Sequence, residues 1–155
     1  SLAMLDGAKG ELVLAHLQHR AAPLLRFRPR DHVEVWNSAC KCGRTAPRIR
    51  CIGRTDDMLI VRGVNVFPSA IREVVSEFVP DVSGHILVKP SQPGIKQEPP
   101  LPIEVELARG RADDAGLAET IRARLRSVLV FTAGIKLVPY GTLQRSEYKS
   151  KLVQH

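Results

Sequence analysis

Three cysteines are the first residues whose type and spacing suggest chemistry, because thiolates bind zinc. Cys40 and Cys42 flank a single residue, and Cys51 follows downstream. A structural zinc site takes four nitrogen or sulfur ligands, and C-x-C plus one more cysteine differs from the paired C-x-x-C spacing of a zinc ribbon. The fourth ligand would have to be one of three histidines: His16, His19 or His32. We expect no metal site, with the three cysteines as the candidates should one exist; the alternative is a Cys-Gly turn with small buried thiols.

The segment from residue 53 to residue 74, GRTDDMLIVRGVNVFPSAIREV, has the most specific order of residue types in the chain. It places a Gly-Arg pair and two consecutive aspartates before an apolar strand, and then a glycine turn before a helix that begins with proline. Composition alone does not explain this order. Residues 58–61 and 64–67 flank Arg62-Gly63, which predicts two strands joined by a tight turn. Gly63 should take a backbone conformation that is unfavourable for other residues.

The elements after this turn predict a small α+β sandwich with both helices on one side of a sheet. Pro68 suits the first position of a helix, and apolar residues then recur with the helical period up to Pro80. Strands are expected at 85–89, 102–108 and 134–138, a second helix at 112–130 and a surface loop at 89–100.

The first third of the chain lacks any segment with the helical period before residue 68 and reads as short strands. Strands are predicted at 11–17 and at 31–36, where Val33 and Val35 alternate with polar residues. The pattern changes near residue 56. We therefore expect two parts, a β subdomain over 1–55 and an α+β domain over 56–155.

The chain has 155 residues and a hydrophobic fraction of 44%, which is typical of a globular protein. Its net charge of +7 suits binding of an anion. The charges are scattered and aromatic residues make up only 5%, so platforms for stacking nucleic-acid bases are scarce. A basic nucleic-acid-binding module and a zinc-stabilised interaction domain remain the alternatives. An odd number of cysteines and no apolar run of about 20 residues favour a cytoplasmic protein.

Five segments in order give the chain a resemblance to the adenylate-forming enzymes, which include acyl-CoA synthetases, peptide-synthetase adenylation domains and luciferases. Within that superfamily the chain most resembles the phenylacetate-CoA ligase family. The resemblance extends over nearly the whole chain. The segments that carry it are GELV at 10–13, RFRPRD at 26–31, CGRT at 42–45, GRTDDMLIVRGVNVFPS at 53–69 and RSEYK at 145–149.

The resemblance implies that 1–55 is the C-terminal β subdomain of a large AMP-binding domain and that 56–155 is a small lid domain with a mixed sheet and two helices. The enzyme would use ATP and Mg²⁺ to activate a carboxylic acid, expected to be aromatic, and would pass the acyl group to coenzyme A. The phosphate loop, adenine-binding strand and acyl pocket of the family lie upstream, and nothing in this chain resembles them. We expect a C-terminal portion that is inactive alone and has neither a nucleic-acid nor a membrane partner.

The resemblance also implies roles for single residues on the nucleotide side. Asp31 would accept hydrogen bonds from the ribose hydroxyls of ATP, with Arg54 as the second ribose contact. The alternative for Asp31 is an ion pair with Arg28 or Arg30. Asp56 would be the hinge between the large domain and the lid, and a turn-capping role is compatible with this.

On the lid, Gly63 would let the pantetheine arm of coenzyme A pass close to the backbone, against the alternative of a glycine required only by the hairpin. Lys149 would be catalytic, since its ammonium can bridge the substrate carboxylate and the α-phosphate. Lys151 is the rival candidate and is expected to be a solvated charge. The chain departs from the family at Pro29, where a threonine is usual, and at Asn65, where some synthetases carry an arginine.

Overall fold

The structure is a computed structural model that describes residues 6–18, 20–112, 115–144 and 152–153. The chain divides into two units, Ser1–Asp56 and Asp57–His155.

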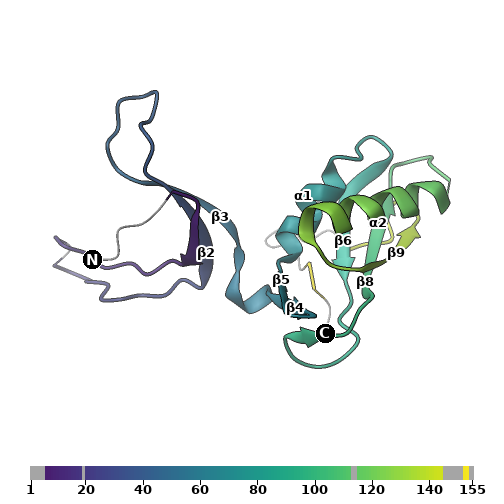
Figure 1. Ribbon diagram of the computed structural model, residues 1–155, viewed down its shortest axis with the longest axis horizontal. Coiled ribbons are helices and arrows are strands. Elements are labelled where there is room, and N and C mark those ends of the chain that lie inside the picture. The colour runs from purple at the N-terminus through teal and green to yellow at the C-terminus, as the bar shows by residue number, and fades with distance from the viewer. Residues whose placement is uncertain (1–5, 19, 113–114, 145–151, 154–155) are drawn as a thin grey trace. The chain divides into compact units, whose positions relative to one another are not determined.

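The first unit is built on a three-stranded antiparallel sheet in the order β1-β2-β3, formed by Ala8–Glu11, Asp31–Trp36 and Arg48–Arg54 (Figure 1). The predicted alternation along β2 is confirmed, because Val33 and Val35 are buried. A register irregularity between His32 and Val33 interrupts the pairing near the start of β2 and the end of β3.

One expectation for this unit is wrong, and one strand was missed. The strand predicted at 11–17 is displaced: β1 ends at Glu11, and Leu14 forms only an isolated bridge with Phe27. Strand β3 was not predicted, because six of its seven residues remain at least partly exposed and only Gly53 is buried. Such a strand is held by its main-chain pairing with β2, and its side chains give no clear periodic signal.

The second unit begins with the predicted hairpin, in which β4, Leu59–Val61, pairs antiparallel with β5, Val64–Val66. Arg62 and Gly63 connect the strands with φ angles of 48° and 81°. Positive φ at both turn positions matches the twist of a two-residue hairpin, so the prediction for Gly63 is confirmed. A further short strand, β7 at Lys96–Gln97, pairs parallel with β4 inside the segment expected to be only a loop.

Both predicted helices are present in the second unit. Helix α1, Pro68–Ser76, starts at its proline and buries Ile71, Val74 and Val75. Helix α2, Ala115–Leu129, buries Leu117, Ile121 and Leu125 at helical spacing. Neither they nor any other described helix has the length and apolar character needed to cross a membrane.

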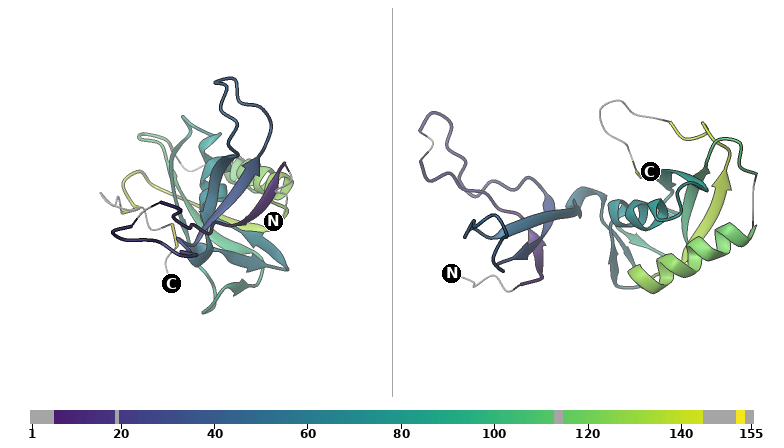
Figure 2. Two further views of the ribbon diagram at one scale, coloured as in Figure 1. Left: turned by 90° about the vertical axis from the view of Figure 1, so that its left-hand side faces the viewer. Right: turned by 90° about the horizontal axis from the view of Figure 1, so that it is seen from above.

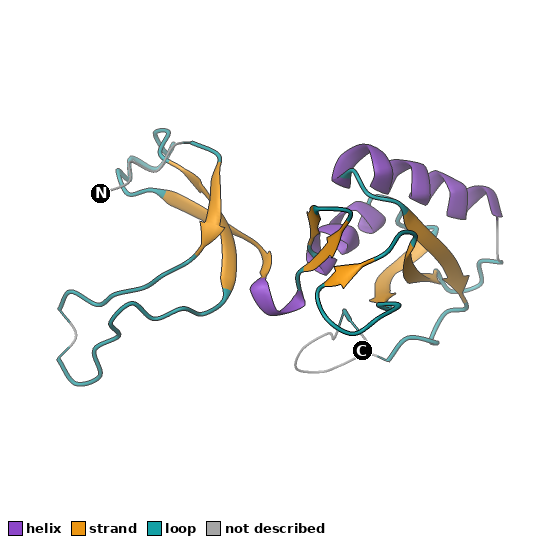
Figure 3. Ribbon diagram, turned by 60° about the horizontal axis from the view of Figure 1, so that its bottom comes forward, coloured by secondary structure: helices purple, strands orange, loops and turns teal. Residues whose placement is uncertain are grey.

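The helices pack on a mixed sheet in the order β6-β8-β9, formed by Val82–Val88, Leu101–Leu107 and Ala133–Val138. Strand β8 pairs antiparallel with β6 and parallel with β9. Helix α1 contacts β6, α2 contacts β9 and the helices contact each other, so both cover one face of the sheet (Figures 1 and 2). The apolar core lies between them, and the expected α+β class with a mixed sheet and two helices is confirmed (Figure 3).

Candidate functional site

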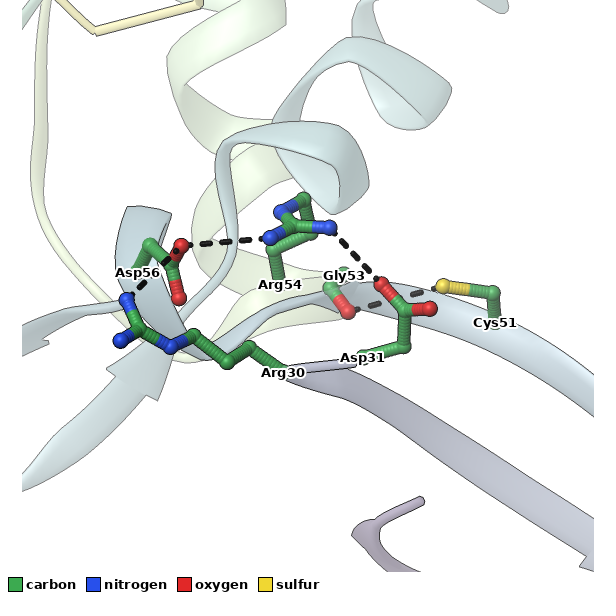
Figure 4. Close-up of polar contacts among 6 residues, drawn as sticks. All are labelled: Arg30, Asp31, Cys51, Gly53, Arg54 and Asp56. Carbon is green, nitrogen blue, oxygen red and sulfur yellow. Dashed lines mark hydrogen bonds and ion pairs between the residues drawn. The ribbon is translucent and has the colours of Figure 1, made fainter. Parts of the chain in front are cut away.

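Asp31 and Arg54 lie together because antiparallel pairing brings the start of one strand to the end of the next. Asp31 is the first residue of β2, Arg54 is the last residue of β3, and the two are partners in the register. Nη1 of Arg54 lies 3.2 Å from Oδ1 of Asp31 (Figure 4). The structure thus brings together the two residues for which the sequence suggested contact with ribose.

Asp56 joins this pair from the short 3-10 helix η1, Thr55–Asp57, which directly follows β3. Its Oδ2 lies 3.2 Å from Nη2 of Arg54 and 3.5 Å from Nη1 of Arg30 (Figure 4). The main chain supports this arrangement, because the Thr55 N–H donates to the carbonyl of Arg30 at 2.8 Å. The predicted ribose contacts and the predicted hinge residue therefore belong to one connected cluster.

Charge alternates through the cluster in the order Asp31, Arg54, Asp56 and Arg30. Partial burial would raise the pKa of Asp56, but the hydrogen bond from Arg54 and the charge of Arg30 outweigh it and hold this pKa below its ordinary value. The side chains of Asp31 and Arg54 are 31% and 43% exposed. Such exposed pairs contribute little to stability, and their polar atoms remain accessible to a ligand.

The alternative partners proposed for Asp31 are bound elsewhere. Arg28 pairs with Glu11 at 3.4 Å, and Arg30 pairs with Asp56. An ion pair between Asp31 and either neighbouring arginine is therefore wrong as an account of this carboxylate, whose ion-pair partner comes from the adjacent strand. Sequence proximity could not reveal this partner, because β3 itself was not predicted.

The cysteines do not converge on one point. The thiol of Cys42 donates to the sulfur of Cys40 at 3.0 Å, whereas Sγ of Cys51 lies 3.5 Å from the carbonyl oxygen of Gly53. The hydrogen bond from Cys42 is the main cause that lowers the pKa of Cys40. Among the described residues, no group of three or more His, Cys, Asp or Glu side chains is arranged to hold a metal ion. His19, one of the candidate fourth ligands, lies outside the described residues.

The alternative expectation for the cysteines is partly correct. A Cys-Gly turn is present, since the Gly43 N–H donates to the Cys40 carbonyl at 2.9 Å. The expectation of buried thiols is wrong, because Cys42 and Cys51 are exposed and Cys40 is only half-buried.

Gly63 lies at the tip of the β4–β5 hairpin. A Cβ built on it would meet no heavy atom within 4 Å, so its positive φ, and not crowding, is what favours glycine here. The hairpin requirement and a close approach by a thin ligand are compatible at this position.

Lys149 and Lys151 lie outside the described residues. The chain on either side of them is described and is held by specific contacts. On the near side, the Leu143 N–H donates to Oε2 of Glu106 at 3.1 Å. On the far side, the Val88 N–H donates to the carbonyl of Leu152 at 2.8 Å. Sequence reasoning missed Glu106, which looks like one more polar residue of an alternating strand.

A family model described as AMP-binding enzyme C-terminal domain matches residues 63–155. The chain belongs to this family. Two curated relatives of this AMP-binding enzyme C-terminal domain are phenylacetate-coenzyme A ligases. The ligase from Thermus thermophilus is 35% identical to this chain, over 92% of this chain and 35% of its own length. The ligase from Escherichia coli is 32% identical, over 94% of this chain and 33% of its own length. The chain thus spans about a third of the length of the curated relatives it matches.

Solved structures agree with the assignment. A 2-hydroxyisobutyryl-CoA ligase in the postadenylation state, in complex with 2-HIB-AMP, matches 97% of this chain and 32% of its own with a TM-score of 0.79 and 29% identity. A domain of phenylacetate-coenzyme A ligase from Bacteroides vulgatus matches 64% of this chain and 92% of its own with a TM-score of 0.51 and 31% identity. The resemblance to the C-terminal portion of a phenylacetate-CoA ligase-like adenylate-forming enzyme is confirmed.

Proposed function

We propose that this chain supplies the end of the large AMP-binding domain, the hinge and the lid of a complete carboxylate-CoA ligase. The observation that carries the proposal is the Asp31–Arg54–Asp56 cluster at the boundary between the two units, in a chain that resembles phenylacetate-coenzyme A ligases along nearly all its length. The complete enzyme would act in the cytoplasm. Its substrates would be ATP, an aromatic carboxylic acid and coenzyme A, and Mg²⁺ would be its metal. The chain alone would be inactive.

The reaction has two steps. The carboxylate attacks the α-phosphate of ATP to give an acyl-adenylate and pyrophosphate, and the thiol of coenzyme A then displaces AMP to give a thioester. Both steps bring a nucleophile to a centre that the protein must hold and shield from water. The residues of this chain therefore act by binding, orienting and delivering charge.

Asp31 fits the ribose role because an ionised carboxylate only accepts hydrogen bonds, which suits the two hydroxyl donors of ribose. The Arg54 guanidinium, held at 3.2 Å on Oδ1, fixes the orientation of this carboxylate. The same guanidinium has five N–H donors in a rigid fork, so it can add a contact to the ribose without releasing Asp31.

Asp56 fits the hinge role because it is the last residue of the first unit and belongs to a single turn of 3-10 helix. A hinge needs only a few residues at the edge of an element to absorb a backbone change.

Lys149 is proposed as the catalytic cation. In the first step a carboxylate approaches a phosphate, and these two anions repel each other until a positive charge lies between them. An ammonium that reaches both groups stabilises the charge that develops in the transition state. Lys151 is proposed to be a solvated charge. Gly63 is proposed to border the path of the pantetheine arm in the second step.

The function is tested with the complete ligase, MgATP and a panel of acids that includes phenylacetate and aliphatic acids of similar size. We expect acid-dependent exchange of pyrophosphate into ATP, release of AMP and formation of a thioester when coenzyme A is added, with aromatic acids preferred. Residues 1–155 alone should show none of these activities. Release of ADP in place of AMP, or equal exchange without any acid, would contradict the proposal.

A further inference from the structure

Glu106 is a charged residue that is buried, although its place in the sheet does not by itself require burial. Along β8, Leu101, Ile103 and Val105 are buried in the core, and Glu104 and Glu106 alternate with them and so lie on the opposite face of the sheet. The side chain of Glu104 keeps 12% exposure beside Lys89 and Lys136, whereas Glu106 is 0% exposed. A fully buried carboxylate is rare unless specific donors satisfy it.

The donors of Glu106 come from the chain that leaves β9. Its Oε2 accepts the N–H of Gly141 at 3.0 Å and the N–H of Leu143 at 3.1 Å. The chain from Pro139 to Thr142 makes a turn in which the Thr142 N–H donates to the Pro139 carbonyl at 3.2 Å. Gly141 stands third in this turn with a φ of 83°, as a type II turn requires. One carboxylate oxygen therefore fixes both the turn and the residue that follows it.

Charge makes this contact stronger than a main-chain pair of the same length, since a carboxylate that accepts N–H groups forms charge-assisted hydrogen bonds. Burial alone would raise the pKa of Glu106, but hydrogen bonds from Leu143, Ser83 and Gly141 outweigh it and lower this pKa. Glu106 is therefore ionised at neutral pH. The turn is held by an anion within the fold.

The far side of the same segment is held on the neighbouring strand. The Val88 N–H of β6 donates to the Leu152 carbonyl at 2.8 Å, and Val88 forms a parallel bridge with Val153. Val88 pairs with Ile103 of β8, three positions from Glu106. Described residues on either side of Lys149 are thus held on two paired strands, Leu143 by the side chain of Glu106 and Leu152 by a main-chain contact with Val88.

We propose that Glu106 is a positioning residue for adenylation: it fixes the exit of the chain from β9 and thereby sets where the segment with Lys149 begins. This inference rests on the proposed function of Lys149. It is distinct from a purely structural role, because a structural carboxylate would affect both half-reactions through stability, whereas an anchor of the lysine segment affects the adenylation step.

The test compares Glu106→Gln with Glu104→Gln in the complete ligase. Glutamine keeps the shape and loses the charge, and Glu104 is a matched control on the same face of the same strand whose partners are lysines. We expect Glu106→Gln to lower kcat for acid-dependent pyrophosphate exchange about tenfold or more while thioester formation from supplied acyl-adenylate stays within about twofold. Glu104→Gln should leave both rates within about twofold. A folded Glu106→Gln enzyme that keeps both rates, or loses both equally, overturns the proposal.

A second measurement does not depend on how the variant folds. Hydrogen exchange in the wild-type ligase should show the Gly141 and Leu143 amides protected as strongly as those of β8. Exchange at the rate of exposed turns would overturn the anchor. Failure of the proposed function looks different: the wild-type enzyme would then lack acid-dependent exchange, or Lys149→Ala would retain it, whatever the protection of these two amides.

Discussion

Arg54 and Asp56, two positions apart in the sequence, are joined by a contact of 3.2 Å between Nη2 and Oδ2, while Nη1 of the same guanidinium lies 3.2 Å from Asp31. One side chain therefore connects the proposed ribose-binding carboxylate to the proposed hinge residue. Such a two-sided contact needs the planar fork of arginine, which lysine does not have. Binding of the nucleotide at Asp31 and the backbone position at Asp56 are expected to depend on each other through Arg54.

The first prediction follows from this geometry. Arg54→Lys keeps the positive charge but can hold only one of the two carboxylates well, so KM for ATP should rise about tenfold, with a smaller change in kcat. Arg50→Lys is the control, since Arg50 pairs with Glu34 on the same sheet. Steady-state kinetics of the complete ligase with ATP varied would check this. An unchanged KM for Arg54→Lys would show that the fork does not orient the ribose site.

The second prediction concerns the hinge. Asp56→Pro restricts φ at one residue of the 3-10 helix, so a backbone change needed between the two steps should become slow. We expect the two half-reactions, measured separately, to be slowed unequally by about tenfold or more. Asp56→Asn is the companion variant, because it removes the charge but leaves φ free, and it should slow both half-reactions to a similar, smaller extent. If Asp56→Pro and Asp56→Asn behave alike, residue 56 is not the hinge.

The third prediction separates two reasons for a glycine at position 63. Gly63→Ala should lower the free energy of unfolding by about 1–2 kcal/mol, because alanine is strained at a φ of 81°. Gly63→Asn should cost less, since asparagine tolerates this region better. If pantetheine passes close to this backbone, both variants raise KM for coenzyme A while adenylation is unaffected. If the hairpin is the only reason, the folded Gly63→Asn enzyme keeps the wild-type KM, as kinetics with coenzyme A varied would show.

The fourth prediction is a pH dependence of stability. In the folded chain the pKa of Glu106 lies below its ordinary value of 4.5, because donors from Leu143, Ser83 and Gly141 outweigh burial. A lowered folded pKa gives stability that is complete above 4.5 and is lost as the pH falls through the folded value. Wild type should exceed Glu106→Gln by about 1.5–3 kcal/mol in unfolding free energy at neutral pH.

Urea unfolding of both proteins at several pH values measures this difference, in which the contributions of the other carboxylates cancel. The difference should shrink steadily once the pH drops below 4.5, the ordinary glutamate value. A gap that stayed constant down to the acid limit of the folded state, or that widened there, would mean that Glu106 is not held as an anion by the turn.

The elements with strong side-chain periodicity could be predicted from the sequence. The hairpin around Gly63, the helix that starts at Pro68 and the strand with Val33 and Val35 all bury one repeating face, and that face is visible in the residue order. Strand β3 and the two-residue β7 could not be predicted, because main-chain pairing with a neighbour holds them and their own side chains show no clear pattern.

The candidate site was predictable in part. The resemblance to a known family indicated Asp31, Arg54 and Asp56 separately, but their connection depends on the register between β2 and β3. Glu106 gave no signal, because its burial comes from a turn 35 residues downstream that covers the strand face. Contacts between residues so distant in sequence are set by tertiary packing, which local patterns do not report.

The central claim is that Lys149 supplies the positive charge for adenylation, and it is tested most directly by measuring the two half-reactions of Lys149→Ala in the complete ligase, with Lys151→Ala as the control. We predict that Lys149→Ala loses acid-dependent pyrophosphate exchange by about a thousandfold while still converting supplied acyl-adenylate and coenzyme A to thioester, because an electrostatic contact made in one transition state is lost. Lys151→Ala should retain both activities. Equal loss of both half-reactions in Lys149→Ala, or loss of adenylation in Lys151→Ala instead, would contradict the account.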